Sequence, residues 1–149
     1  MSHIPGLVIR KAGPEDLPEI ARLMRQWSNT AWNFMVQHTP GEDLQFIRRC
    51  FDAGPIWTAF EEDRVLGFCA VRRGWIDLFH VGPELHGRGI GRALLKRALT
   101  GRRRVKLWTF QRNIRTRRFY ALQGFHELRL TDGGENEEGE PDVLLEWRG

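Results

Sequence analysis

The chain has 149 residues, of which 41% are hydrophobic and 28% charged, with a formal net charge of +4. This composition is typical of a globular protein and predicts one domain over residues 1–149. No apolar run reaches the length of a membrane span and no signal-peptide pattern opens the sequence, so we expect a cytoplasmic protein without membrane partners. Cys50 and Cys69 lack metal-type spacing, and no metal site is predicted.

Hydrophobic periodicity and turn residues predict the elements in chain order. They are a strand at 7–10, helices from 14 and 44, strands at 56–60, 65–71 and 75–81, a helix from 90, a strand at 105–109, a helix at 113–122, and strands at 125–130 and 143–147. The strand–helix–strand order in the middle requires at least one parallel pair, because a helix crossover joins parallel strands. We therefore predict an α/β fold with a mixed sheet.

A glycine-rich turn follows the strand at 75–81 and opens the next helix. Its residues are His86, Gly87, Arg88, Gly89, Ile90, Gly91 and Arg92. Glycines let backbone N–H groups converge, and a helix start adds unpaired N–H groups and partial positive charge, so the turn is a candidate phosphate site. The pattern matches neither a P-loop nor a dinucleotide fingerprint. A close-packed turn without a ligand is the alternative interpretation.

Charge is segregated along the chain. Residues 132–142 hold six acidic and no basic residues, whereas the rest of the chain has 23 basic and 13 acidic ones. A basic body suits an anionic ligand, and the acidic stretch suits either a cationic ligand or a solvated hairpin tip.

The element order and two motifs resemble the GNAT superfamily of acyl-CoA-dependent N-acetyltransferases, over about Leu7 to Trp147. The first motif is Val81 to Gly91, which looks like the family's pyrophosphate loop, with His86 where the family usually has Gln or Arg. The second is Asn113 to Phe125, which looks like its late helix with an Asn, a Tyr and a Gly-Phe ending. The resemblance implies a largely antiparallel central sheet of about seven strands, a splayed central parallel pair and four helices.

The resemblance also implies the binding residues for acetyl-CoA as co-substrate. The pantetheine arm would pair with backbone groups of Phe79, His80 and Val81, and the Val81 N–H would stabilise the developing oxyanion. The diphosphate would bind the amides from Gly87 to Arg92, helped by Arg88 and Arg92. Candidates for the 3′-phosphate are Arg117, Arg118 and the run 102–104, and Asn113 would contact pantetheine or cap its helix.

Two groups are predicted to move protons. Tyr120, the only tyrosine, occupies the position from which the family donates a hydrogen bond or proton to the departing thiolate. Asp77 lies among apolar strand residues, and strand alternation places it on the face of Trp75 and Phe79, where burial would raise its pKa to suit a base. His80 is predicted on the opposite face and is the second candidate base.

We expect an acyltransferase that moves the acetyl group of acetyl-CoA directly to a primary amine of a small molecule, acting as a monomer or homodimer. Some of Trp27, Trp32, Phe34 and Trp108 are candidates to line the acceptor pocket. The alternatives are a non-catalytic acyl-CoA-binding module and an acetyltransferase acting on a protein or RNA-linked amine. Nucleic acid is not expected as a partner, because no free aromatics interleave with the arginines.

Overall fold

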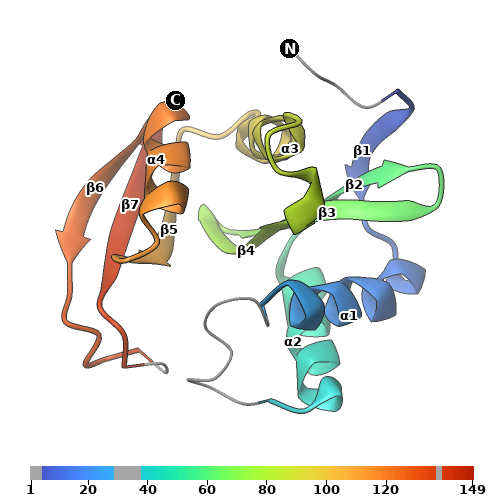
Figure 1. The fold of residues 1–149 in the computed structure, drawn as a ribbon, viewed down its shortest axis with the longest axis horizontal. Helices are drawn as coiled ribbons and strands as arrows, with labels where there is room; N and C mark the ends of the chain where they lie inside the picture. Colours follow the sequence, from blue (N-terminus) through green and yellow to red (C-terminus); the bar gives the residue numbers. More distant parts are fainter. Residues whose placement is uncertain (1–4, 29–37, 137–138) are drawn as a thin grey trace.

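A computed structural model describes residues 5–28, 38–136 and 139–149. Figure 1 shows a central twisted sheet with helices on both faces. The elements are β1 (Leu7–Lys11), the 3₁₀ turn η1 (Pro14–Asp16), α1 (Leu17–Ser28), α2 (Pro40–Ala53), β2 (Ile56–Glu61), β3 (Arg64–Arg72), β4 (Trp75–Val81), the 3₁₀ turn η2 (Pro83–Leu85), α3 (Ile90–Leu99), β5 (Arg104–Phe110), α4 (Ile114–Leu122), β6 (Phe125–Leu130) and β7 (Asp142–Arg148).

The strands form one mixed sheet in the order β1-β2-β3-β4-β5-β7-β6. Every neighbouring pair is antiparallel except β4 and β5, which are parallel because α3 carries the chain from one to the other. The predicted fold class is confirmed, with seven strands and four helices in the described part of the chain.

Local sequence signals explain where the helices begin and end. Thr39 caps α2 with a reciprocal capping box, in which its hydroxyl accepts from the Glu42 N–H and the Glu42 carboxylate accepts from the Thr39 N–H. Pro40 occupies the first helical position, where its missing N–H costs nothing. Gly124 follows α4 with φ of +98°, as expected for a residue that stops a helix in the left-handed region.

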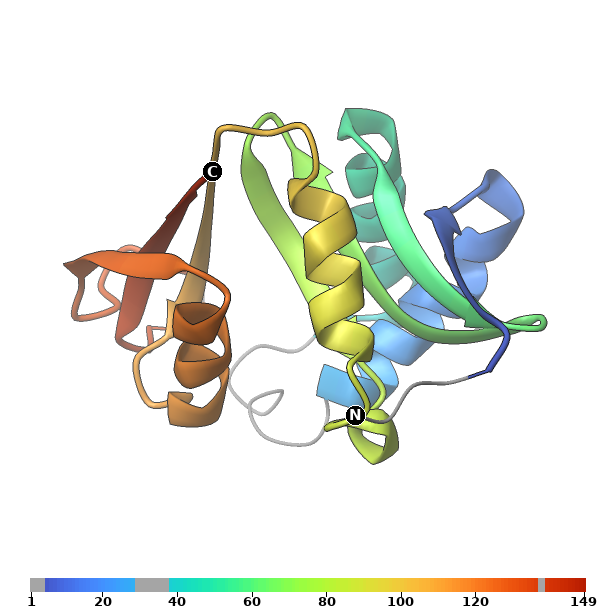
Figure 2. The same cartoon turned by 90° about the horizontal axis from the view of Figure 1, so that it is seen from above.

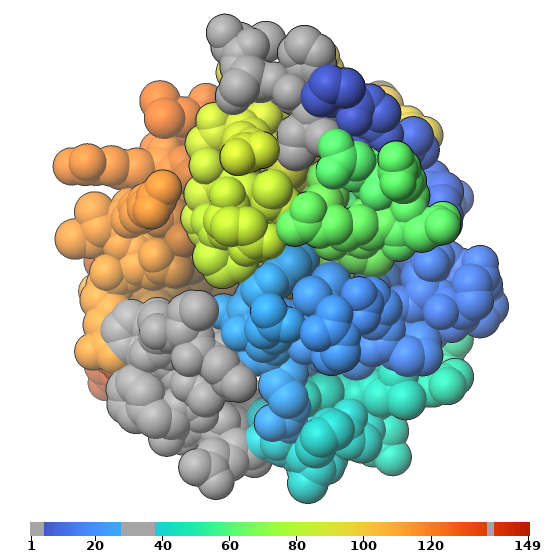
Figure 3. Space-filling view, turned by 45° about the vertical axis from the view of Figure 1, so that its right-hand side comes forward, coloured from blue at the N-terminus to red at the C-terminus, as the bar shows by residue number. Residues whose placement is uncertain are grey.

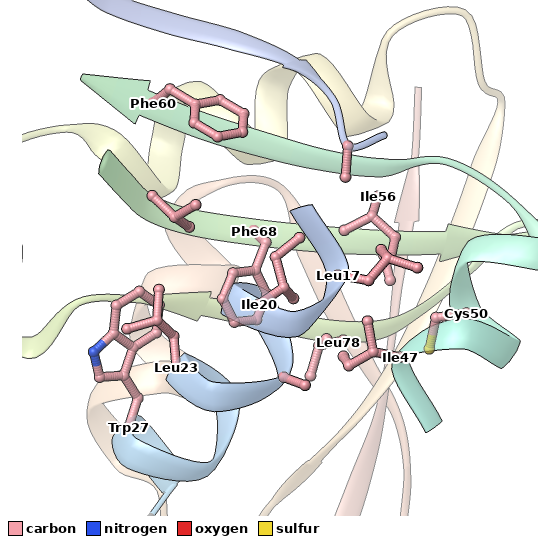
Figure 4. Packing of buried hydrophobic residues seen from close by; sticks show 14 residues of the cluster. Leu17, Ile20, Leu23, Trp27, Ile47, Cys50, Ile56, Phe60, Phe68 and Leu78 are labelled. Atoms are coloured by element: carbon pink, nitrogen blue, oxygen red, sulfur yellow. The ribbon is translucent and has the colours of Figure 1, made fainter. Parts of the chain in front are cut away.

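Helices α1 and α2 cover one face of the first half of the sheet. Figure 4 shows their apolar side chains meeting those of β2, β3 and β4, with Phe68 at the centre. Trp27 stacks on the Phe68 ring at a centroid distance of 5.4 Å and an angle of 14°. Phe68, Ile20 and Ile47 are fully buried, so this cluster fixes the two helices on the sheet.

Helices α3 and α4 cover the opposite face. Apolar residues of α3 pack on β2, β3 and β4, while Tyr120 of α4 packs with Leu107, Leu145 and Phe125 of the second half of the sheet. Among the described elements no helix covers the other face of β5, β7 and β6 (Figure 2). Within the described residues, the second half of the sheet therefore has one face covered by a helix and one face without a helix, which we call the open face.

Candidate functional site

In the described part of the chain, the parallel strands β4 and β5 pair only near their N-terminal ends. Trp75 is in register with Lys106, whose N–H donates to the Gly74 carbonyl at 2.8 Å. Beyond this point the two strands diverge, as Figure 2 shows from above. We call the region between their diverging ends the wedge; its wide end lies between Val81 of β4 and Phe110 of β5.

Backbone groups of β4 point into the wedge in alternation. The Gly82 N–H donates to the Leu66 carbonyl of β3 at 3.0 Å, and hydrogen-bonded pairs alternate along an antiparallel ladder. The N–H and C=O of His80 therefore face Phe68 of β3, and those of Phe79 and Val81 face the wedge. The prediction of unpaired backbone groups is thus wrong for His80, whose peptide groups belong to the ladder with β3.

The His86 ring lies beside the end of β4. Its Nε2 is 3.1 Å from the Val81 carbonyl oxygen. With Nε2 protonated, the imidazole donates to this carbonyl and ties the glycine turn to the end of β4. The motif predicts His86 only as a substitute for Gln or Arg, and it does not predict this backbone contact.

The glycine turn presents a row of unpaired N–H groups at the start of α3. Gly87 and Gly89 have φ of +84° and +82°, a region that glycine adopts without strain. The N–H groups of residues 87–91 donate to no carbonyl among the described residues. In the space-filling view of Figure 3, the yellow-green surface of η2 and this turn reaches solvent beside the orange surface of α4. The donors suit a diphosphate.

Tyr120 of α4 packs against β4 and β5 within a cluster of aromatic rings. Phe79, Phe119 and Phe125 surround it with ring centroids 5.2 to 5.9 Å away. Its hydroxyl makes no hydrogen bond with the described residues. Every fully buried side-chain oxygen among these residues has a hydrogen-bond partner, so the Tyr120 hydroxyl oxygen is in part accessible to solvent. Burial raises the pKa of Tyr120 far above its ordinary value, and the phenol therefore stays a hydrogen-bond donor.

The position of Asp77 differs from the expectation in burial and in orientation. A β-bulge in β4, where Ala70 pairs with Leu78 and Val71 with Ile76, leaves Asp77 as the extra residue. The bulge interrupts the alternation, so Asp77 and Phe79 lie on opposite faces of the strand. Asp77 is exposed rather than buried, and its carboxylate accepts two hydrogen bonds from Arg72 at 2.8 and 3.0 Å.

His80 lies on the face of the sheet that α1 covers. Because of the bulge, Asp77 lies on this face as well. The His80 ring is 5.7 Å from the Phe68 ring. Burial lowers the pKa of His80 to about 4, so the imidazole is neutral at neutral pH and is a weak base. The predicted placement of His80 opposite Asp77 is wrong for the same reason, the extra residue in β4.

The lowered pKa of His80 predicts an acid-sensitive stability. An unfolded histidine titrates near 6.5, so between pH 6.5 and about 4 the unfolded chain binds more protons and the free energy of unfolding falls as the pH falls. The loss is at most about 3 kcal/mol for a shift of this size. Urea unfolding of His80→Gln across this range should lack that slope. His126→Gln, at an exposed site on β6, should keep it; equal slopes in all three proteins would contradict the prediction.

Other predicted binding residues are placed with mixed results. Asn113 stands at the N-cap of α4, but its side chain makes no capping hydrogen bond. Arg117 pairs with Glu127 at 2.7 Å and donates to the Gln111 carbonyl, so it belongs to the packing of α4 rather than to a free basic surface. Arg88 and Arg118 are exposed. The roles of these residues toward a ligand stay predictions.

The acidic stretch forms the loop between β6 and β7 at the open end of the wedge. Asp142 accepts hydrogen bonds from Thr131 and Asn136, and Glu140 pairs with Arg112 at 3.4 Å. These acids hold the loop together, while Asp132 and Glu135 are exposed. A cationic ligand for this stretch stays a prediction.

The aromatic residues predicted to line the acceptor pocket lie in different environments. Trp27 is a core residue, whereas Trp108 of β5 is 44% exposed on the open face of the sheet. Trp32 and Phe34 lie outside the described residues.

In the described ranges no group of His, Cys, Asp or Glu side chains could hold a metal ion, and no helix is long and apolar enough to cross a membrane.

Comparison with known proteins agrees with this architecture. The model of the acetyltransferase (GNAT) family matches residues 21–125. A peptidyl-lysine N-acetyltransferase from Escherichia coli, YiaC, is 27% identical over 94% of this chain and 96% of its own, and an uncharacterized N-acetyltransferase from Archaeoglobus fulgidus is 31% identical over 85% and 95%. The acetyltransferase yncA from Salmonella typhimurium, solved with its cofactor acetyl-CoA, has a TM-score of 0.76 at 18% identity, covering 95% of this chain and 93% of its own.

The fold, the wedge and these matches define an acyltransferase. The chain belongs to the GNAT family of acetyltransferases.

Proposed function

We propose that this protein transfers the acetyl group of acetyl-CoA to the side-chain amine of a lysine in a peptide or protein. The observation that carries the proposal is that three features gather around the end of β4: the peptide groups of Phe79 and Val81, the N–H row of residues 87–91, and Tyr120, whose ring centroid is 5.9 Å from that of Phe79. The structural neighbour yncA has acetyl-CoA as its cofactor, and YiaC is named for peptidyl-lysine.

The chain's own groups suit the successive parts of this coenzyme. The N–H and C=O of Phe79 can pair with the amides of pantetheine as a neighbouring strand would, which leaves the Val81 N–H for the thioester. The N–H groups of residues 87–91 and the positive end of the α3 dipole can bind the diphosphate, with His86 and Arg88 beside them. The coenzyme supplies an activated acetyl thioester.

Three groups then serve the transfer. The Val81 N–H, directed into the wedge, donates to the thioester oxygen as negative charge develops on it. Tyr120 donates a hydrogen bond to the leaving sulfur, because its raised pKa keeps the proton on the phenol until the sulfur becomes anionic. Asp77 lies on the face from which an amine can approach and can accept its proton directly or through water. His80 shares this face, but its lowered pKa makes it the weaker base.

A small-molecule amine is the acceptor that the sequence predicts, and a peptide is the one we favour. YiaC is named for peptidyl-lysine. Trp108 is 44% exposed on the face of β5 and β7 that no described helix covers, so this face can be reached by an extended chain. A small ligand would gain most from an enclosed site.

Two measurements test the proposed function. Calorimetry should give saturable binding of acetyl-CoA, and thiol release should depend on added lysine peptides. Thiol release with small amines but not with lysine peptides would indicate that the acceptor is a small molecule. Saturable binding without release for any amine would indicate a non-catalytic acyl-CoA module, and the absence of binding would contradict the proposal altogether.

A further inference from the structure

The open face of the second half-sheet carries an ordered set of side chains. Alternation along β5 places Arg104, Lys106, Trp108 and Phe110 on this face, because Val105 and Leu107 are buried on the other. The register sets residues of β7 beside them: Arg148 beside Arg104, Glu146 beside Lys106, Leu144 beside Trp108 and Asp142 beside Phe110.

One end of this face is basic. Arg148 bonds Glu146 at 2.8 Å, and Arg104 approaches the same carboxylate at 3.5 Å. The hydrogen bond from Arg148 lowers the pKa of Glu146, and the charges of Arg104 and Lys106 lower it further. A single carboxylate therefore stands against three cations, and positive charge is left over for a ligand.

One neighbouring segment enlarges the basic end. The turn between β3 and β4 brings Arg73 close, since the Gly74 carbonyl accepts from the Lys106 N–H at 2.8 Å. Arg73 is exposed. Arg103 is left out, because alternation along β5 places it on the face of Val105. We define the basic end as Arg73, Arg104, Lys106 and Arg148.

The other end of the face is acidic and lies at the opening of the wedge. The Gln111 side chain donates to the carbonyls of Thr131 and Asp142, which fixes the β6–β7 loop to the end of β5. Asp132 and Glu135 of this loop are exposed. Between the two ends lies the half-exposed Trp108. The face thus runs from basic, across an aromatic, to acidic at the reaction centre.

The strand geometry sets the distance between the ends. Six residue steps separate Arg104 from Phe110, and a strand rises about 3.3 Å per residue, so the ends are about 20 Å apart. An extended peptide has nearly the same rise and covers this distance in about six residues. A peptide whose lysine is at the wedge would therefore place a residue about six positions away over the basic end.

Resting on the proposed function, we propose that the acceptor is an acid-flanked lysine segment of a protein, bound extended along the open face of β5 and β7. The cationic lysine enters at the acidic loop, and Asp or Glu side chains about five to seven residues away pair with the basic end. Charge complementarity at both ends carries the assignment, because opposite charges steer a segment into one orientation and disfavour the reverse.

The experiment compares two lysine peptides of identical composition, one with three acids five to seven residues from the lysine and one with these acids adjacent to it. We expect kcat/KM to favour the distant acids by about three- to tenfold, as a few exposed ion pairs would give, and the preference to shrink in 0.5 M salt. The double variant Lys106→Gln/Arg148→Gln should lose the preference and keep turnover of the other peptide. Arg48→Gln, an exposed arginine of α2, should change neither.

Each other outcome overturns the inference. Equal kcat/KM for both peptides, with turnover intact, would remove the acid-flanked acceptor and leave the proposed function standing. Turnover of small amines but of no peptide would remove both the docking surface and the peptide acceptor. A single-stranded RNA that binds wild type, loses affinity in the double variant and leaves peptide turnover unaffected would assign the basic end to nucleic acid instead.

Discussion

Tyr120→Phe should lower kcat by about 10²- to 10⁴-fold, the range typical of a lost acid in the transition state. The substitution removes one hydroxyl that makes no hydrogen bond among the described residues and keeps the ring that Phe79, Phe119 and Phe125 surround. The measurement is steady-state thiol release with a saturating lysine peptide, together with calorimetry of acetyl-CoA.

The same variant separates a chemical role from a packing role. Because no partner of the hydroxyl is left unsatisfied, the free energy of unfolding should stay within about 0.5 kcal/mol of wild type. Coenzyme affinity should also be retained, since the hydroxyl is assigned to the departing sulfur. A normal kcat would remove Tyr120 from the mechanism. A reduced kcat accompanied by a large loss of stability would assign the effect to the aromatic cluster.

Much of the site could be predicted from the chain because glycine and helix signals are local. Gly87 and Gly89 adopt the positive φ values that the turn requires, and Ile90 begins α3 directly after them. The order of elements also fixed the parallel pair of β4 and β5. These features depend on residues near one another in sequence, where periodicity and turn chemistry are informative.

The errors all concern β4, and one extra residue explains most of them. Period-two alternation from Trp75 places Asp77 with Phe79, but the bulge at Asp77 reverses the sides of every later residue relative to that expectation. Asp77 then meets Arg72 across the β3–β4 turn, so its expected burial is wrong. A single sequence carries no signal for a bulge of this kind, because it depends on how β3 pairs with β4.

The direction of each β4 peptide group could not be predicted from the sequence either. Whether His80 or Val81 points its N–H at the wedge depends on the phase of the ladder with β3, which the Gly82–Leu66 bond sets. The His86 contact with the Val81 carbonyl also requires the turn to fold back over the strand end. The sequence motif predicts that the segment from Phe79 to Val81 binds the coenzyme. Only the pairing of β4 with β3 decides which backbone groups of this segment are free to bind a ligand.

Val81→Pro should lower kcat by about 10²- to 10³-fold, the cost of removing one oxyanion donor. Proline removes the Val81 N–H, which faces the wedge and not β3, so the ladder loses no hydrogen bond. Val81→Ala is the matched control, because it shortens the same side chain and keeps the N–H. The kcat of both variants, measured with saturating acetyl-CoA and peptide, isolates the contribution of that single donor.

A proline one residue earlier tests the assignment of the ladder itself. In His80→Pro the lost N–H is one that faces Phe68 of β3, so we expect a loss of stability of several kcal/mol, whereas Val81→Pro should lose much less. Urea unfolding of both variants gives the comparison. If Val81→Pro unfolds as readily as His80→Pro, the Val81 N–H belongs to the sheet and cannot serve the thioester. If it is stable but turns over as fast as Val81→Ala, a donor other than Val81 stabilises the oxyanion.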